Sequence, residues 1–384
     1  MKLEDAMSPL DYARLTAHKR EFQAAVSYAL GIDSQRFIGN SVSTFSALMI
    51  MERRMLDKWA AYYNGGNIPL TGFLQGMVKL PWVFTHNNQS WEYDYMVKAA
   101  VLSANKIGTL QPHCIFKGSN ESDIAVWLVN NGVGLIDHTP YWTSKFQEKY
   151  RLSHAQKNLD ASHLFADVSS MLGTFARLDI PVIKELYQYT YILYTDTDVF
   201  FQLPFTLDTF GLPLPPSLAM AYERPEAFPY NAGVLLMNLP VMRKDHQDII
   251  DTMLFSSQNN GFHYGRFGPG DQGVLNMFYE EDLKQHVLPE AFNAKIYKPL
   301  VKHVYIVHFQ GPKPDDILDY LENGHCRFKD MCAEAVGYNA CDYVLSWARL
   351  GVAASDDDVG HQVSDRVRIA CAVWTRATEQ CTKQ

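Results

Sequence analysis

Two aspartates stand two residues apart at the end of an apolar run, in the stretch YILYTDTDVFF (191–201). Carboxylates held this close repel each other unless a cation neutralises them or one of them binds a proton. A hard divalent ion such as Mg²⁺ or Mn²⁺ takes oxygen ligands and commonly bridges phosphates. A solvated turn also explains the pair, because Asp is common in turns. TYILY favours the functional interpretation, since residues i and i+2 of a buried strand would direct Asp196 and Asp198 to one place.

Three later stretches place polar groups beside apolar runs. YNAGVLLMNL has Asn231 at the start of a strand-like run, where the amide could hydrogen-bond a polyhydroxylated ligand or cap a turn. GPGDQGVLN has Asp271 and Gln272 opening a helix-like run, and such an Asp, taken alone, is best explained as an N-cap. VYIVHFQGPKP ends in His308 and Lys313, of which the imidazole suits a metal and the ammonium a phosphate. A lone His after a strand is more often structural.

The elements that must position these groups alternate between strands and helices from Leu80 onward. PWVFTHNN, HCIFKG and VGLIDHTP are typical of strands, and a helical face between the first two consists of Val97, Ala100, Val101 and Ala104. This alternation predicts an α/β fold with a mainly parallel central sheet covered on both faces. Ligands bind at the carboxyl ends of strands in such sheets, so the two aspartates after TYILY fall where a site is expected.

Composition restricts the partners and the compartment. The chain has 384 residues, 47% of them hydrophobic, and a formal net charge of −8 without a basic stripe, so nucleic acid is not an expected partner. The first residues lack the apolar run of a secretory signal. The apolar stretch FSALMIMERRMLDKW is interrupted by charged residues before it is long enough to cross a bilayer. We therefore expect no transmembrane segment, with peripheral membrane association left open. The six cysteines match no metal pattern or dense disulfide framework, so reduced cysteines and a cytoplasmic location are the default. A truncated enzyme from the Golgi lumen is the alternative.

Three regions are predicted along the chain. Residues 1–79 form a helical N-terminal extension that ends in the linker-like stretch NGGNIPLTG. Residues 80–315 form the α/β domain, and residues 316–384 a helical C-terminal extension. The two extensions contain no motif that indicates chemistry.

Five stretches in a fixed order resemble the retaining glycosyltransferases of family 8, the group of glycogenin and the bacterial lipopolysaccharide galactosyltransferases. The resemblance extends from about Trp82 to Pro314 and rests on TFARL, LYTDTDV, NAGVLLMNL, DQGVLN and HFQGPKP together. It implies a GT-A type, Rossmann-like nucleotide-diphosphosugar transferase domain. The metal ligands would be Asp196, Asp198 and His308. The groups near the nucleoside and the phosphates would be Thr85, Asn87, Gly311 and Lys313. The donor-sugar pocket would include Arg177, Asn231, Asp271 and Gln272.

The implied activity is a metal-dependent transfer of a hexosyl or pentosyl group (EC 2.4 type). The donor would be a nucleotide-diphosphate sugar, most simply a UDP-sugar with Mn²⁺ (or Mg²⁺), and the acceptor a glycan or a protein. The family retains the anomeric configuration, and Gln272 is a poor nucleophile, which favours attack on the face of the leaving phosphate. Inversion would need a carboxylate base, for which Asp271 is the candidate. In two places this chain departs from the family: only Pro312 separates Gly311 from Lys313, and Asp-Gln-Gly lacks a third polar residue.

Two other classes of protein fit parts of the sequence. Phosphatases of the haloacid dehalogenase superfamily also have a strand that leads into Asp-x-Asp, with Asp196 then the nucleophile and Asp198 the general acid. Against this, about a hundred residues of α/β pattern precede the motif, and GDQGVLN has no second acidic residue to complete the metal site. The third interpretation is a non-catalytic sugar-nucleotide binder or scaffold whose terminal helices are its working parts.

Overall fold

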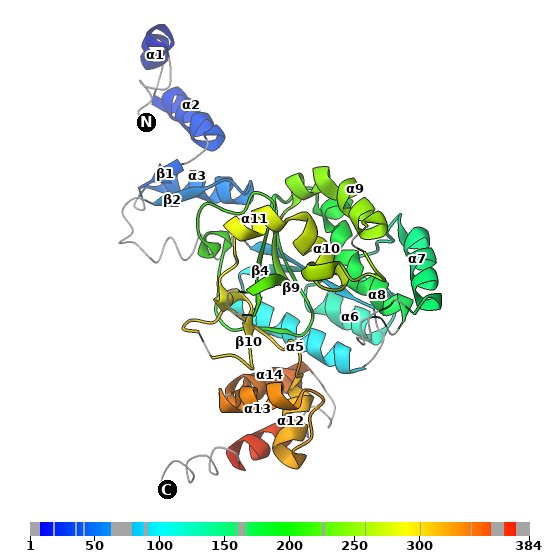
Figure 1. The fold of residues 1–384 in the computed structure, drawn as a ribbon. Coiled ribbons are helices and arrows are strands. Elements are labelled where there is room, and N and C mark those ends of the chain that lie inside the picture. The colour runs from blue at the N-terminus through cyan, green and yellow to red at the C-terminus, as the bar shows by residue number, and fades with distance from the viewer. Residues whose placement is uncertain are drawn as a thin grey trace. The chain divides into compact units, whose positions relative to one another are not determined.

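The chain divides into two compact units, residues 1–79 and 80–384, shown in a computed structural model (Figure 1). The structure describes residues 8–17, 20–34, 37–40, 43–62, 79–87, 91–157, 159, 165, 167–224, 227–257, 259–299, 301–338, 340–354 and 365–373. The linker-like stretch NGGNIPLTG lies outside the described residues, and each unit is considered by itself.

The first unit contains the expected helices and also a small sheet. Its helices are α1 (Pro9–Thr16), α2 (Arg20–Asp33) and α3 (Thr44–Met55). Two three-residue strands, β1 (Phe37–Gly39) and β2 (Ala60–Tyr62), pair in parallel on either side of α3 in the sequence. Strands this short leave no detectable period, which is why the sequence pattern predicted helix alone. The buried Arg53 joins the pieces by donating to the carbonyl oxygens of Gly31 (2.6 Å) and Trp59 (2.8 Å).

The second unit is built on a six-stranded sheet in the order β5-β4-β3-β6-β9-β8. Strands β3, β4, β5 and β6 run parallel, whereas β9 is antiparallel to both β6 and β8. The prediction of an α/β fold with a mainly parallel sheet is confirmed. The strands are β3 (Leu80–His86), β4 (Leu110–Phe116), β5 (Gly134–Ile136), β6 (Tyr191–Thr195), β8 (Leu218–Arg224) and β9 (Ala227–Asn238).

A second sheet of three strands lies in the same unit, in the order β10-β11-β7. Its strands are β7 (Val199–Phe201), β10 (Ala294–Lys295) and β11 (Ile306–His308). Strand β11 pairs in parallel with β10 and antiparallel with β7, so that His308 lies opposite Val199. This register brings the end of the VYIVHF run next to the residues that follow β6.

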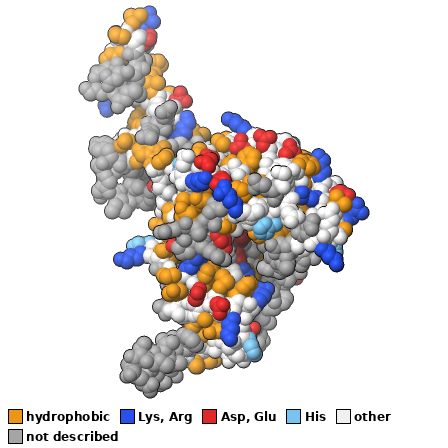
Figure 2. Space-filling model, viewed as in Figure 1, with side chains coloured by type: hydrophobic (Ala, Val, Ile, Leu, Met, Phe, Trp, Pro, Cys, Tyr) orange, Lys and Arg blue, Asp and Glu red, His pale blue; other side chains and the backbone are white. Residues whose placement is uncertain are grey.

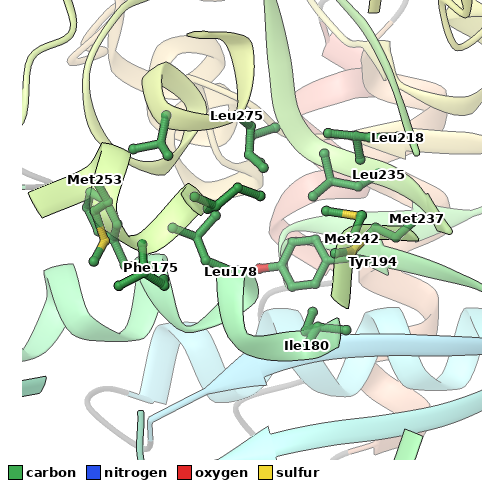
Figure 3. Packing of buried hydrophobic residues seen from close by; sticks show 14 of the residues in the cluster. Phe175, Leu178, Ile180, Tyr194, Leu218, Leu235, Met237, Met242, Met253 and Leu275 are labelled. Atoms are coloured by element: carbon green, nitrogen blue, oxygen red, sulfur yellow. The ribbon is translucent and has the colours of Figure 1, made fainter. Parts of the chain in front are cut away.

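Helices cover both faces of the six-stranded sheet, because successive strand residues point to opposite faces and in strands such as β6 all of them are buried. From β6, Ile192 and Tyr194 enter the cluster with α8 (Val168–Phe175), α9 (Leu239–Phe255) and α10 (Gly270–Phe278). Figure 3 shows this packing around Tyr194. Leu193 faces the other way, toward α5 (Trp91–Ile107) and α6 (Asp123–Asn130).

The remaining helices complete the second unit. They are α7 (Thr143–Ala155), α11 (Glu280–Gln285), α12 (Pro314–Asn323), α13 (Lys329–Gly337) and α14 (Ala340–Ala354), with 3-10 turns at Ala176–Val182, Lys184–Leu186, Leu207–Phe210, Gly265–Phe267 and Glu290–Phe292. The C-terminal helices and the helical residues 365–373 share a buried cluster with Met96 and Ala99 of α5. Among the described residues, no helix has the length and apolar character needed to cross a membrane.

Disulfides join four of the five cysteines that the structure describes, so the expectation of reduced cysteines was wrong for these four. Cys326 pairs with Cys332, and Cys341 on α14 pairs with Cys371 in the helical residues 365–373. Cys114 is free and buried. Spacing along the chain did not indicate these pairs, because it is helix packing that brings Cys341 and Cys371 together. Stable disulfides are typical of oxidising compartments, so the default of a cytoplasmic location loses its basis.

Candidate active site

Asp196 and Asp198 lie in a turn, not on a strand. Strand β6 ends at Thr195 and β7 begins at Val199, so both carboxylates belong to the connection between the two sheets. Backbone hydrogen bonds fix this turn on two sides: the Asp196 N–H donates to the Gly233 carbonyl oxygen (2.8 Å), and the Phe309 N–H donates to that of Asp198 (2.9 Å). The two carboxylates converge because β9 and β11 hold the turn, rather than through the two-residue repeat of a strand.

His308 completes a group of three potential metal ligands. Its Nε2 lies 3.9 Å from Asp196 Oδ2 and 3.4 Å from Asp198 Oδ1, and one ligand atom from each residue lies within 4.8 Å of the others. The imidazole fits only because residue 233 is glycine: a Cβ there would lie 2.0 Å from His308 Cε1. The structure thus brings together the three ligands predicted from the sequence.

The group fits a divalent cation on chemical grounds. Asp198 Oδ1 is buried and has no hydrogen-bond partner among the described residues, although buried carboxylate oxygens are normally satisfied. Burial alone would raise the pKa of Asp198, but the adjacent Lys313 ammonium, the largest opposing influence, holds that pKa well below its usual range. The carboxylate therefore stays ionised. Two carboxylates and one imidazole suit Mn²⁺ or a similar ion, and a ligand set of oxygens alone would suit Mg²⁺ better.

Lys313 reaches this group even though only Pro312 separates it from Gly311. Gly311 adopts a φ of +78°, a left-handed conformation that favours glycine, in the bend that follows β11. The Lys313 Nζ then forms an ion pair with Asp198 and donates to the Phe309 carbonyl oxygen (2.9 Å). The Lys313 side chain is one-quarter exposed, so an anion that approaches the proposed metal ligands would meet its ammonium.

Arg177 is a buried cation between two carboxylates. It lies in the 3-10 turn after α8, and its Nη2 donates to Asp196 Oδ1 (2.7 Å) while its Nε lies 3.0 Å from Asp271 Oδ2. Its Nη1 donates to the Ala232 carbonyl oxygen (2.6 Å), and the guanidinium stacks 4.6 Å from the centre of the Tyr194 ring. Burial would lower the pKa of Arg177, but the two carboxylates outweigh it, so the side chain stays charged.

Asp271 is not the N-cap of α10, which is Pro269; it lies in the first turn of the helix. Its Oδ2 is buried without a hydrogen bond among the described residues, because the Arg177 Nε–H is directed to the Thr174 carbonyl oxygen (3.0 Å). Burial raises the pKa of Asp271 to about 6, assisted by Asp196 and opposed by Arg177. The next residue, Gln272, accepts through Oε1 from the Ala232 N–H (3.1 Å).

Of the two residues at the end of β3 that were predicted to contact the nucleoside, Thr85 is connected to this group through Tyr194. The Thr85 hydroxyl lies 3.5 Å from the Tyr194 hydroxyl, which donates to Asp196 Oδ1 (3.2 Å). Asn87 lies against Gly173 of α8, where a Cβ would come within 3.2 Å of its Nδ2. Their predicted contact with a nucleoside stays a prediction.

Two residues with no sequence signal also belong to the group. Asn293, buried just before β10, accepts from His308 Nδ1 through its Oδ1 (2.9 Å) and donates to Asn231 Oδ1 (2.8 Å). Glu223, on β8, accepts from Asn231 Nδ2 (2.8 Å) and from Gln310. Asn293 lies in LPEAFNAKIY, which has no pattern to distinguish it. Only the pairing of β10 with β11 places it beside His308.

Comparison with known proteins gives structural neighbours only. No protein-family model matches the chain, and no curated protein matches its sequence. Glycosyltransferase GlyE of Streptococcus pneumoniae TIGR4 is 20% identical with a TM-score of 0.43, and the alignment covers 71% of this chain and 62% of GlyE. Galactosyltransferase LgtC, in complex with donor and acceptor sugar analogs, is 17% identical with a TM-score of 0.45, covering 68% and 96%. Mouse xyloside xylosyltransferase 1 is 17% identical with a TM-score of 0.42, covering 62% and 99%. At this level of similarity, the function has to be argued from the site itself.

Proposed function

We propose that this protein is a metal-dependent glycosyltransferase with a GT-A type domain, which moves a sugar from a nucleotide-diphosphate donor to a glycan or protein acceptor. The observation that carries the proposal is the convergence of Asp196, Asp198 and His308 at the carboxyl end of β6, with Lys313 beside them. A phosphate-binding site needs fixed positive charge, and a pair of carboxylates becomes attractive to a phosphate only through a bridging cation.

In the proposed glycosyl transfer, each of the protein's side chains has a separate role. A bound divalent ion would supply Lewis-acid stabilisation of the diphosphate leaving group. Lys313 would turn from Asp198 to the diphosphate, adding a second positive charge where negative charge develops. Arg177 holds Asp196 and Asp271 in place through its ion pairs. Thr85 and Asn87 would lie toward the nucleoside, as predicted from the sequence.

We also propose that the transferred sugar keeps its anomeric configuration. Gln272 Oε1 already accepts from the Ala232 N–H and from Asn231, and an amide is a poor nucleophile in any case. The leaving diphosphate would then direct the acceptor to the face that it leaves. Asp271 is the base that an inverting reaction would use. Product analysis by NMR decides between the two, because an inverted anomeric centre contradicts the front-face route.

The donor would be a UDP-sugar with Mn²⁺ (or Mg²⁺). The two disulfides favour an oxidising compartment, such as the Golgi lumen, over the cytoplasm. On the face drawn in Figure 2, acidic and basic side chains are interspersed over the surface.

Calorimetric titration of UDP, in Mn²⁺ and in EDTA, tests the proposal. Wild type should bind only with metal, and the double variant Asp196→Asn/Asp198→Asn should not bind. A double variant with the same charge change on the exposed face of α9, Asp248→Asn/Asp251→Asn, should bind like wild type. Binding that ignores both metal and Asp196/Asp198 contradicts the donor site.

Two outcomes would favour the other classes of protein. A beryllium fluoride adduct on Asp196 would indicate a phosphatase that forms an aspartyl-phosphate, as in the haloacid dehalogenase superfamily. UDP binding without any hydrolysis or transfer across a panel of UDP-sugars would indicate a non-catalytic binder.

A further inference from the structure

We infer that Asn293 and Asn231 are positioning residues that fix the tautomer of His308, leaving its Nε2 unprotonated and directed at Asp196 and Asp198. We call these two residues the amide relay. The inference rests on the proposed metal site, since it explains how His308 is kept in the form that binds a metal. Both side chains of the relay are buried, with exposed fractions of 1% for Asn293 and 5% for Asn231.

The orientation of the relay follows from one backbone group. The Gly233 N–H can only donate, and it lies 3.1 Å from Asn231 Oδ1, which identifies that atom as the oxygen. The Asn293 atom that lies 2.8 Å from the same oxygen must then be the Nδ2 amide nitrogen. The other end of the Asn293 side chain is consequently Oδ1, an acceptor.

The protonation of His308 follows in turn. Its Nδ1 lies 2.9 Å from Asn293 Oδ1, and two atoms at this distance need a proton between them, which only Nδ1 can supply. In the neutral ring, Nε2 then carries a lone pair instead of a proton, and this atom lies 3.4 Å from Asp198 Oδ1. A metal ligand of this kind is normally oriented through its other ring nitrogen.

The relay opposes the arrangement that the neighbouring carboxylates would favour. Without an acceptor at Nδ1, the neutral imidazole gains by placing its proton on Nε2, where Asp196 and Asp198 lie within 3.9 Å as acceptors. A proton there occupies the lone pair that a metal needs. Asn293 prevents this by making Nδ1 the better-bonded site for the proton.

Glu223 anchors the far end of the relay. Its Oε2 accepts from Asn231 Nδ2 (2.8 Å), and Gln272 Oε1 lies 3.3 Å from the same nitrogen. Together with the Gly233 and Asn293 bonds, these use both donors and both acceptor positions of the Asn231 amide. Asn231 thereby acquires a positioning role, which differs from the donor-sugar contact predicted from the sequence.

Nitrogen NMR of the metal-free full chain, labelled with ¹⁵N-histidine, tests the inference. Long-range ¹H–¹⁵N correlations report which ring nitrogen carries the proton, and a His308→Gln variant assigns the signal. We expect the proton of wild-type His308 on Nδ1. Asn293→Leu removes the acceptor at similar size and should move the proton to Nε2. Asn293→Asp keeps an acceptor and should leave it on Nδ1.

Mn²⁺ titration of the same proteins gives the second readout. The Asn293→Leu variant should bind Mn²⁺ about 10- to 100-fold more weakly than wild type, and Asn293→Asp no more weakly. Asn259→Leu is the matched control, because Asn259 also bonds at both ends, to Met253 O (2.6 Å) and Phe262 N (2.8 Å), without contacting His308. It should leave both readouts unchanged.

The outcomes separate this inference from the proposed function. A wild-type signal with the proton on Nε2 overturns the inference, even if Asn293→Leu fails to fold. An unchanged tautomer and unchanged Mn²⁺ affinity in folded Asn293→Leu also overturn it. If wild type binds no Mn²⁺ while the tautomer follows the variants as expected, the inference stands and the proposed function fails.

Discussion

Gly233→Ala should strongly weaken metal binding, although residue 233 is not itself one of the proposed metal ligands. The new Cβ would lie 2.0 Å from His308 Cε1, 2.8 Å from Nδ1 and 2.9 Å from Nε2, whereas ordinary contact begins at 3.4 Å. The ring must therefore move by about 1.4 Å, or the backbone at residue 233 must move by as much. A backbone shift would pull on the 2.8 Å bond from the Asp196 N–H to the Gly233 carbonyl oxygen. Either relaxation displaces a proposed ligand.

The size of the effect follows from the tolerance of metal sites. Metal–ligand distances in proteins hold to about 0.2 Å, so a shift of 1.4 Å removes His308 from the ligand set. Disturbing only the groups that orient a ligand costs about 10- to 100-fold in affinity. Losing the ligand should therefore weaken Mn²⁺ binding by at least about 100-fold. Overpacking should also lower the free energy of unfolding by about 1–3 kcal/mol.

Mn²⁺ titration and urea unfolding measure the two effects. Gly134→Ala is the matched control: this strand glycine also faces an imidazole, but its Cβ would stand 3.0 Å from His113 Nδ1, so a shift of a few tenths of an ångström suffices. It should leave Mn²⁺ affinity unchanged. A double-mutant cycle with His308→Ala should show that the stability cost of Gly233→Ala disappears once the ring is gone. Wild-type Mn²⁺ affinity in a folded Gly233→Ala variant would refute the reasoning.

Two further predictions concern stability. Asp179 accepts from His138 (2.7 Å), His246 (2.8 Å) and Trp142 (2.7 Å), and although burial alone would raise its pKa, these bonds lower it to about 2. Because the folded pKa lies below the unfolded value of 3.8, the carboxylate contributes about 2 kcal/mol above pH 4, which is lost as the pH falls from 4 to 2. Urea unfolding against pH should show this slope in wild type and lose it in Asp179→Asn; an equal slope in both would disprove the assignment. The Cys341–Cys371 disulfide, with a sequence separation of 30, should stabilise the fold by about 3–4 kcal/mol. A reducing agent should therefore lower the melting temperature of wild type much more than that of a Cys341→Ala/Cys371→Ala variant, and equal shifts would contradict this.

The sequence indicates the main sheet well, because its signals are local. β3, β4 and β6 were each recognisable as apolar runs that end in polar residues, and the helix between β3 and β4 had a clear apolar face. These patterns follow from burial on one or both faces, which each segment meets on its own. The first unit shows the limit, since strands of three residues leave no period to detect.

The sequence predicted those site residues that stand at or just after the end of a strand. Asp196, Asp198 and His308 all follow apolar runs, and the structure brings their side chains together. Asn293 and Glu223 were missed because their roles depend on contacts across 15 and 8 residues of chain, to His308 and Asn231, that no local pattern encodes. The disulfide between Cys341 and Cys371 was missed for the same reason.

The charges of the site explain why it should take a metal and a diphosphate together. In the set of side chains joined by ion pairs to Arg177 and Lys313, the carboxylates Asp196, Asp198 and Asp271 contribute three negative charges at pH 7, since the pKa of Asp271 is about 6, and the two cations contribute two positive charges. The balance is −1, which a divalent cation changes to +1 and so makes attractive to a phosphate. Each ligand should then raise the affinity for the other by the same factor. An anion without the cation would face a net repulsion, and this is the physical reason to expect that UDP binding to this site depends on the metal.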